Sequence, residues 1–283
     1  MKQLLQPRRL WIARDALTAI GVVAVVLVWL EFTRSGGLPV DMRYYWAADP
    51  GNLYPHPELG EGNGYNYSPA FELLVAWGRL LPFEVFVGIW RAVLLAALVY
   101  LAGPFTILVL FTVPVASEIN AGNIQILLAL AVACSFRWPV AWAFVLLTKL
   151  TPGVGLLWFV LRREWRALLF ALGATIAIAA VSFVFNPDAW SGYVRLLTGE
   201  PAPAVAPYYL SFWVRLPFAL AFIAFGAWRG YRWPVVVGAT LALPVYYIIS
   251  SSMLVGTLPF LRGEIGRRVE ATWPGALRRT GIA

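Results

Sequence analysis

Apolar runs separated by short polar or basic links recur along most of the 283-residue chain. The first run, residues 16–32, approaches the roughly 20 apolar residues that a straight membrane-spanning helix needs. Several later runs are well below that length, which predicts short, broken or paired helices inside a bundle. Counting each run as one crossing predicts an all-α polytopic membrane protein with about ten transmembrane helices. The later runs cover residues 84–103, 104–117, 123–136, 138–149, 152–161, 164–185, 208–228, 232–244 and 246–261.

The polar gap after the first run is rich in aromatic and acidic residues, and it interrupts an otherwise apolar chain at residues 34–68. We interpret residues 34–83 as a large first loop, because a loop of this size beside a bilayer usually carries function. Within it, residues 70–80 predict an amphipathic helix lying along the membrane surface. In a rival interpretation, residues 70–80 are a short crossing and residues 138–161 form one span kinked at Pro152. Charge alone does not separate the two.

Composition agrees with a membrane protein, since 60% of the residues are hydrophobic, 13% are charged and the mean hydropathy is +0.72. A net charge of +8 could indicate nucleic-acid binding. The arginines, however, sit at the ends of apolar runs and form no single stripe, so they report topology and exclude a nucleic-acid partner. Membrane lipids are the expected surroundings.

Basic residues set the predicted orientation, because cytoplasmic segments carry an excess of Lys and Arg. The basic N-terminus and the basic tail, residues 262–283, are expected in the cytoplasm, which makes residues 1–261 one membrane-embedded domain. The first run lacks a small-residue cleavage site and is read as a retained helix. Residues 34–83 and 186–207 then lie on the extracytoplasmic side of the plasma membrane.

Polar residues from four separate regions gather on this predicted outer face, as a membrane-embedded active site or binding cleft would need. The regions are the first loop, residues 117–125, residues 149–152 and residues 186–207. The candidate site residues are Asp41, Arg43, Tyr44, Tyr45, Tyr65, Tyr67, Glu118, Asn120, Asn123, Gln125 and Lys149.

Several candidates also have ordinary structural interpretations. Asp41 could cap the helix that starts near Met42, since Asp is a favoured N-cap residue. Asp49 precedes Pro50 and is expected to form an Asx-type turn. The tyrosines are individually more typical of interface anchors, although sugars stack on such rings and at least one is expected to contact substrate.

Cationic side chains are the candidates for binding a phosphate. Lys149, one of two lysines, lies inside an apolar stretch, where an ionisable residue is a functional candidate. It could equally be a lysine that extends to the interface from a helix end. Arg43 is the second candidate, and Arg91, Arg195 and Arg215 are weaker ones, since Arg suits phosphate but also marks helix ends.

Metal chemistry has little support in the sequence. One His and one Cys cannot build a zinc site, and His56 is expected to be an exposed loop residue. Glu118 could bind a divalent cation, orient an acceptor or be a solvated loop acid. We therefore predict no cofactor and no metal site, with a divalent metal left open.

An ordered set of motifs resembles glycosyltransferase family 87. Its elements are Val40-Asp41 with Tyr44, then Tyr54, then Tyr65-Asn66-Tyr67-Ser68-Pro69, then Gly122-Asn123-Ile124-Gln125, then Leu147-Thr148-Lys149-Leu150-Thr151-Pro152 ahead of Arg162-Arg163-Glu164-Trp165-Arg166. The resemblance covers roughly residues 10–260.

The resemblance implies a C-type membrane glycosyltransferase fold and transfer from a polyprenyl-phosphate sugar, mannose or another hexose or pentose, to a lipid or glycan acceptor. In this family the first outer loop supplies an Asp as general base, which maps onto Asp41. An inverting transfer needs one such carboxylate to take the proton of the acceptor hydroxyl.

Two other classes stay open. A transporter or flippase for a lipid or lipid-linked sugar would show charged groups near mid-membrane and two related halves, and the sequence indicates neither. A non-catalytic scaffold on the same fold is the other alternative.

Overall fold

The protein is all-helical over the residues that the computed structural model describes, which are 7–55, 64–199 and 210–263. This confirms the predicted fold class. The N-terminal third contains α1 (Pro7–Ser35), α2 (Val40–Trp46), α3 (Pro69–Val75), the 3-10 helix η2 (Ala76–Leu80) and α4 (Phe83–Ala102). The middle contains η3 (Gly103–Phe105), α5 (Thr106–Leu110), α6 (Val113–Ala121), α7 (Gln125–Ser135), η4 (Pro139–Ala141) and α8 (Trp142–Thr148). The remainder contains η5 (Thr151–Leu156), α9 (Leu157–Leu161), α10 (Trp165–Phe185), α11 (Pro187–Thr198), α12 (Phe212–Arg229), α13 (Trp233–Leu241) and η6 (Ile248–Thr257).

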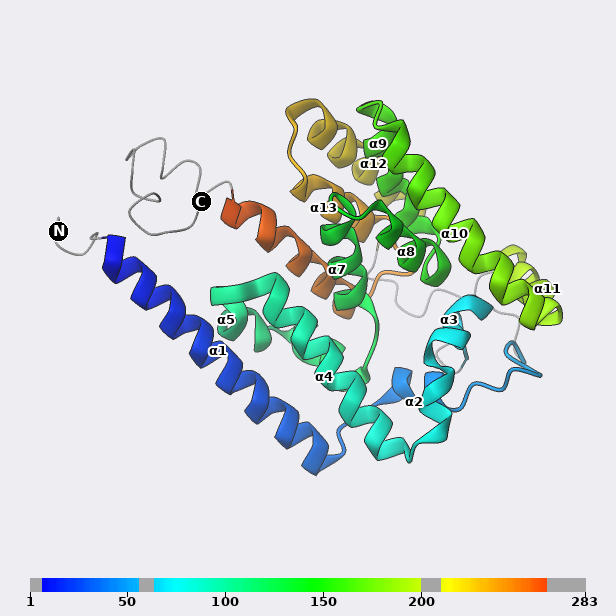
Figure 1. The fold of residues 1–283 in the computed structure, drawn as a ribbon, viewed down its shortest axis with the longest axis horizontal. Coiled ribbons are helices and arrows are strands. Elements are labelled where there is room, and N and C mark those ends of the chain that lie inside the picture. Colours follow the sequence, from blue (N-terminus) through cyan, green and yellow to red (C-terminus); the bar gives the residue numbers. More distant parts are fainter. Residues whose placement is uncertain (1–6, 56–63, 200–209, 264–283) are drawn as a thin grey trace.

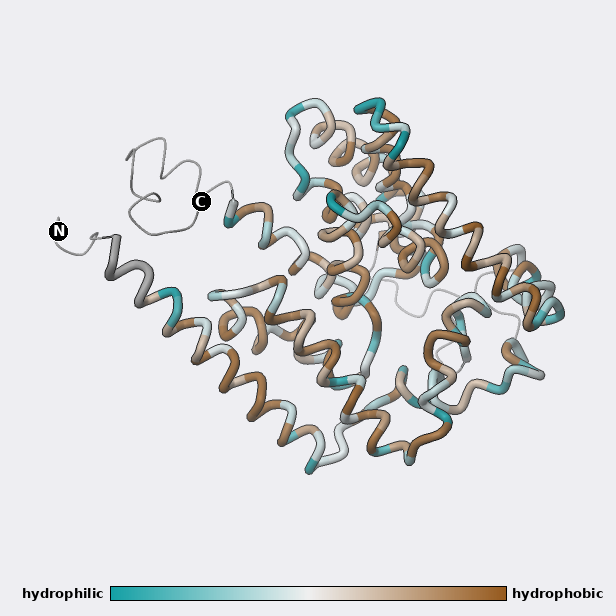
Figure 2. The backbone as a smooth tube through the Cα atoms, viewed as in Figure 1, coloured by the Kyte–Doolittle hydropathy of each residue, from teal (hydrophilic) through white to brown (hydrophobic). Residues whose placement is uncertain are grey.

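The long helices α1, α4 and α10 run roughly parallel to one another (Figure 1). Along α1 and α10, hydrophilic residues gather near the helix ends and hydrophobic ones lie between (Figure 2). In an apolar 18-residue stretch of α10 only 11% of the residues are buried within the protein, and in the corresponding stretch of α1 only 17% are. Apolar helices this exposed match a protein whose outer surface faces lipid.

Four described helices are long and apolar enough to cross a membrane: Ala13–Ser35, Phe83–Leu110, Trp165–Phe185 and Phe212–Arg229. A fifth candidate is the pair α6 and α7, which bend by 107° at their junction. The expected count of about ten crossings is not confirmed. Many of the shorter runs form helices of fewer than 18 residues, which pack against one another.

The segment from α8 to α9 turns back on itself at Lys149. Phe136, which precedes the segment, contacts Trp158 near its end with ring centroids 5.4 Å apart. In a single span, residues 22 apart would be separated by about 33 Å, at 1.5 Å per residue. The rival interpretation of residues 138–161 as one kinked span is therefore wrong.

The predicted surface helix at residues 70–80 is present as α3 and η2, which follow one another. Glu72 in α3 is 3% exposed and forms an ion pair with Arg79 in η2. Arg79 also donates to the carbonyl of Ala48, 3.0 Å away. This short unit is consequently fixed to the loop after α2.

Basic residues from distant segments meet at one end of the bundle, here called the basic end. Arg162 after α9 donates to the carbonyl of Ala227 in α12 at 3.1 Å, and the Arg232 guanidinium lies 5.3 Å from the ring centroid of Phe136. The tail beyond residue 263 and His56 lie outside the described residues.

Candidate functional site

A cavity of about 350 Å³ lies away from the basic end, because α10 starts just after Arg162 and leads, at its other end, to α11, whose Tyr193 lines the cavity. It collects side chains from regions far apart in the sequence: α2, the segment before α3, the α6–α7 junction, the α8–η5 turn, α11 and the segment between α13 and η6. Its polar lining consists of Asp41, Tyr44, Tyr45, Asn66, Tyr67, Asn123, Gln125, Thr148, Lys149, Thr151, Tyr193, Tyr247 and Ser250.

Asp41 lies in the first turn of α2, and Asn123 holds its carboxylate. The Nδ2 of Asn123 donates to Oδ2 of Asp41 at 3.0 Å, while its Oδ1 accepts from the backbone N–H of Ile124 at 2.7 Å. No side chain caps α2, so the simple capping role for Asp41 is wrong. The amide of Asn123 instead fixes the orientation of a carboxylate that lines the cavity.

Three influences act on the Asp41 carboxyl. Burial raises its pKa, while the positive charge of Lys149 and the hydrogen bond from Asn123 lower it. A carboxyl with a raised pKa is a stronger base once it is ionised. Asp41 therefore combines a fixed orientation with the basicity that proton abstraction requires.

Lys149 closes α8 with extended backbone, φ −137° and ψ 106°, and the chain then enters η5 through Pro152. This turn places the side chain on the cavity wall together with Asp41. None of the ion pairs among the described residues includes Lys149. Its ammonium interacts electrostatically with Asp41 and Glu118, and is placed to bind an anionic group that enters the cavity.

The aromatic candidates divide into lining and supporting residues. Tyr44, Tyr45 and Tyr67 line the cavity, and the hydroxyls of Tyr45 and Tyr67 are 3.1 Å apart. Tyr65 lies outside the lining, is 6% exposed and donates to the carbonyl of Ser68 at 3.1 Å. Tyr54 donates to the carbonyl of Tyr67 at 2.7 Å. The last two tyrosines shape the loop that carries Tyr67.

The polar candidates of the α6–α7 region have different positions. Gln125 and Asn123 line the cavity, whereas Glu118 is fully buried beside it and accepts from the backbone N–H of Ile126 at 3.1 Å. Glu118 thus supports the start of α7 and is not a solvated loop acid. Asn120 accepts from the backbone N–H of Leu38 at 2.9 Å, which ties it to the link between α1 and α2.

The arginine candidates do not line the cavity. Arg43 and Arg195 are exposed, on α2 and α11. Arg91 and Arg215 are buried and donate to backbone carbonyls, among them those of Phe32 and Leu243. Phosphate binding by Arg43 stays a prediction. Asp49 accepts from the backbone N–H of Gly51 at 2.9 Å, which confirms the expected Asx-type turn.

Sequence reasoning missed the lining residues Tyr193, Tyr247 and Ser250. Tyr193 belongs to α11, whose polar and apolar residues alternate as in an amphipathic surface helix. That pattern was a usable signal for α11 as a cover over the site. Tyr247 and Ser250 lie at the start of η6, inside a run that reads as a simple membrane helix, and nothing local marked them.

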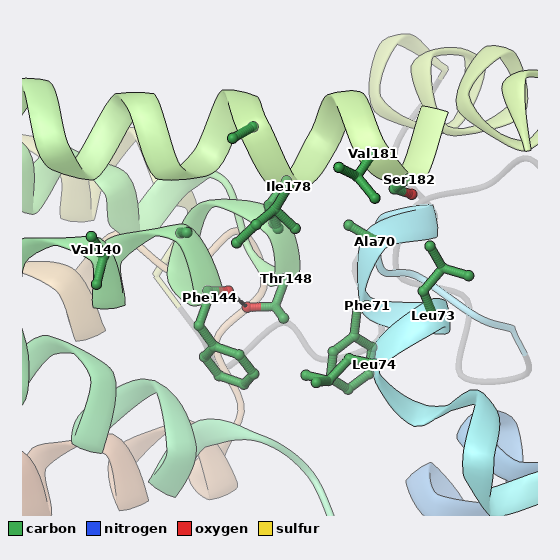
Figure 3. Close-up of a pocket in the computed structure, with 13 residues that line it drawn as sticks. Ala70, Phe71, Leu73, Leu74, Val140, Phe144, Thr148, Ile178, Val181 and Ser182 are labelled. Atoms are coloured by element: carbon green, nitrogen blue, oxygen red, sulfur yellow. Dashed lines mark hydrogen bonds between the residues drawn. The ribbon is translucent and has the colours of Figure 1, made fainter. Parts of the chain in front are cut away.

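An apolar groove of about 610 Å³ lies beside the cavity, between α3, α8 and α10 (Figure 3). Phe71 and Leu74 of α3 face Phe144 of α8 across it, and Ile178 of α10 points into it (Figure 3). Thr148 lines both the groove and the polar cavity. A ligand with a hydrocarbon chain and a polar head could therefore occupy both spaces at once.

Within the described ranges, no group of three or more His, Cys, Asp or Glu side chains could hold a metal ion.

Comparison with known proteins gives two matches. The model of glycosyltransferase family 87 matches residues 65–252. A curated relative, the polyprenol-phosphate-mannose-dependent alpha-(1-2)-phosphatidylinositol pentamannoside mannosyltransferase of Mycolicibacterium smegmatis, is 28% identical over 217 residues. The alignment covers 66% of this chain and 53% of the relative, so the chain spans about half of that protein. No solved structure matches.

Proposed function

This chain belongs to glycosyltransferase family 87, and we propose that it is a membrane enzyme that transfers a sugar from a polyprenyl-phosphate donor to a lipid or glycan acceptor. The observation that carries the proposal is a pair of neighbouring spaces, one apolar and one polar, which share Thr148 as a lining residue and of which the polar one has Asp41 and Lys149 on its wall. A polyprenyl-phosphate sugar has this division between a long hydrocarbon chain and a charged, hydroxyl-rich head.

The donor would lie with its polyprenyl chain in the groove between α3, α8 and α10. Because α10 is mostly exposed along its span, the chain could enter directly from the bilayer. The phosphate would then reach the α8–η5 turn, where Lys149 donates charge-assisted hydrogen bonds to its oxygens. Tyr44, Tyr45 and Tyr67 would flank the sugar.

Asp41 acts as the general base in a single displacement with inversion. Its carboxylate takes the proton of the acceptor hydroxyl, and the hydroxyl oxygen forms a bond to the anomeric carbon. The bond from that carbon to the phosphate oxygen breaks on the opposite face of the sugar. Its electron pair leaves with the polyprenyl phosphate, whose negative charge Lys149 stabilises.

Mannose is the donor sugar that the relative's name supports, and a lipid acceptor is the matching choice, since that protein is described as acting on a phosphatidylinositol pentamannoside. The distribution of charge supports an extracytoplasmic site in the plasma membrane. The basic end, with Arg162 and Arg232, would face the cytoplasm together with both chain termini, and the cavity would then open on the other side.

Transfer by the purified protein tests the proposal. Protein in lipid nanodiscs is mixed with polyprenyl-phosphate [¹⁴C]mannose and a phosphatidylinositol mannoside acceptor, and labelled product is measured. We expect label in the acceptor and release of polyprenyl phosphate. Binding of the donor with no transfer to any lipid or glycan acceptor would favour the scaffold instead. Movement of intact donor across a vesicle membrane would favour a flippase.

A further inference from the structure

Arg91, near the middle of α4, is a buried guanidinium whose hydrogen bonds all go to backbone carbonyls. It is 0% exposed and donates to Phe32 at 2.7 Å, Asn120 at 3.2 Å and Gly36 at 3.3 Å. It forms none of the ion pairs found in the described part of the chain. A buried charge is costly unless its partners repay the cost. Arg91 therefore joins the end of α1, the α1–α2 link and the end of α6.

The link that Arg91 holds leads directly to Asp41. Gly37 has φ 56°, and a Cβ there would collide with the side chains of Arg91 and Asn120. The next residue, Leu38, donates its backbone N–H to Oδ1 of Asn120 at 2.9 Å. Arg91 and Asn120 thus fix the chain three residues before Asp41.

The neighbouring residue on α4, Trp90, contacts the segment that carries Asn123, the hydrogen-bond partner of Asp41. Its indole N–H donates to the carbonyl of Gly122 at 2.8 Å. Gly122 has φ 78°, and a Cβ there would collide with Met42, the residue that follows Asp41. Trp90 therefore fixes the turn immediately before Asn123, whose amide donates to the Asp41 carboxylate.

We propose that Trp90 and Arg91 are positioning residues that hold Asp41 and Asn123 in register, and so set the orientation of the base. These two consecutive residues of α4 contact the segment before Asp41 and the turn before Asn123. Neither side chain needs to contact substrate, since both act through backbone carbonyls. The catalytic consequence rests on the function proposed above, because it assumes that Asp41 removes a proton.

The hydrogen bonds of Trp90 and Arg91 to backbone carbonyls are called the clamp below. Weakening this clamp should alter the ionisation of Asp41. The Asn123 hydrogen bond stabilises the ionised carboxylate, so losing the register raises the pKa of Asp41. Asp41 must be ionised to accept a proton, and the acidic limb of the rate profile should then move to higher pH. The charged and titratable groups near Asp41 or on elements that pack against α2 are Lys149, Glu118, Tyr45, Tyr67, Glu72, Arg79 and Arg91.

The test uses Trp90→Phe, which removes the indole N–H together with part of the ring system, and Arg91→Lys, which keeps the charge but replaces the wide planar guanidinium with a compact ammonium that cannot span the same carbonyls. The matched controls are Trp29→Phe, where an indole N–H to the Gly88 carbonyl is lost, and Arg262→Lys, where a bond to the Leu101 carbonyl is altered. Folding is compared by thermal unfolding in nanodiscs.

For both clamp variants we expect kcat to fall by about ten- to a hundredfold with little change in donor KM, since small misplacements carry costs of this size. The acidic limb should move up by about one pH unit, equivalent to losing part of a charge-assisted hydrogen bond. The controls should match the wild type. Unchanged kcat and an unchanged pH profile in both clamp variants, with folding intact, would overturn the proposal.

A readout that does not depend on activity separates this proposal from the proposed function. The pKa of the Asp41 carboxyl is measured by infrared difference spectroscopy on ¹³C-Asp-labelled protein, with Asp41→Asn to assign the band. If the pKa of Asp41 is raised in Arg91→Lys but the wild type transfers no sugar, the positioning role of Arg91 is supported and the proposed enzymatic function is rejected. An unchanged pKa with an active wild type would reject the clamp alone.

Discussion

Replacing Lys149 with Met tests how the cavity recognises an anionic head group. The substitution keeps an unbranched side chain but removes the ammonium. Lys149 forms none of the ion pairs recorded among the described residues, so no direct salt bridge is lost, although its longer-range attraction to Asp41 and Glu118 is. A hydrogen bond that involves a charged group contributes about 1.5–3 kcal/mol net. Loss of the phosphate contact should therefore weaken donor binding roughly ten- to 150-fold.

The affinity of the donor is measured directly, by titrating polyprenyl phosphate and its mannosyl form into protein in nanodiscs. Lys149→Arg should retain most of the affinity, because the charge remains. Arg43→Met is the comparison, since Arg43 is the other phosphate candidate but is exposed on α2 and does not line the cavity. An unchanged Kd for Lys149→Met, or a larger loss for Arg43→Met, would refute the assignment of the phosphate to Lys149.

Two further predictions concern the groove and the α6–α7 turn. Ala177→Trp should fill the apolar groove and raise KM for a long-chain donor by about tenfold or more, since two lost methylene contacts are worth about 1.6 kcal/mol. KM for a short-chain donor should not change in this variant. The control Leu169→Trp, at an exposed position of the same helix, should behave as the wild type with both donors. Gly122→Ala should destabilise the protein by roughly 2–4 kcal/mol, because it combines a positive φ with a collision against Met42. Thermal unfolding measures this cost, and Gly173→Ala on α10, where nothing lies within 4 Å, should cost little or nothing.

Residue polarity within apolar runs was sufficient to predict which segments meet at the site. Asp41, Asn123 and Lys149 lie 26 or more residues apart in the sequence, yet each follows or precedes an apolar run at the same predicted face. Because helices that alternate in direction return their ends to a common side, the grouping could be read before the fold was known. The structure brings all three to the wall of one cavity.

Burial around the site could not be predicted in the same way. Tyr65 and Tyr67 belong to one short motif and their ring centroids are 5.7 Å apart, but only Tyr67 lines the cavity, while the Tyr65 hydroxyl donates to the Ser68 carbonyl. Glu118 looked like a loop acid, although the chain folds it beneath the start of α7. The predicted number of crossings is not confirmed for a related reason, since short apolar runs also form helices that pair inside the bundle.

The role of Arg91 was also hidden in the sequence. From the sequence, Arg91 was a weak candidate for binding phosphate. The structure shows that its partners are three backbone carbonyls. Such contacts join backbone atoms of Phe32, Gly36 and Asn120, whose side chains carry no signal for them. A buried cation bound by backbone carbonyls can therefore be identified only from the three-dimensional structure.

The most direct test of the account is the turnover of Asp41→Asn. Asn has the size of Asp but cannot accept the acceptor's proton, and a general base contributes about a hundred- to ten-thousandfold to rate. Labelled transfer is measured alongside donor affinity, with Asp49→Asn, in the turn that holds Gly51, as the control. The account predicts that Asp41→Asn loses transfer by that factor, binds donor as the wild type does, and that Asp49→Asn stays active. Near-wild-type transfer by Asp41→Asn would contradict it.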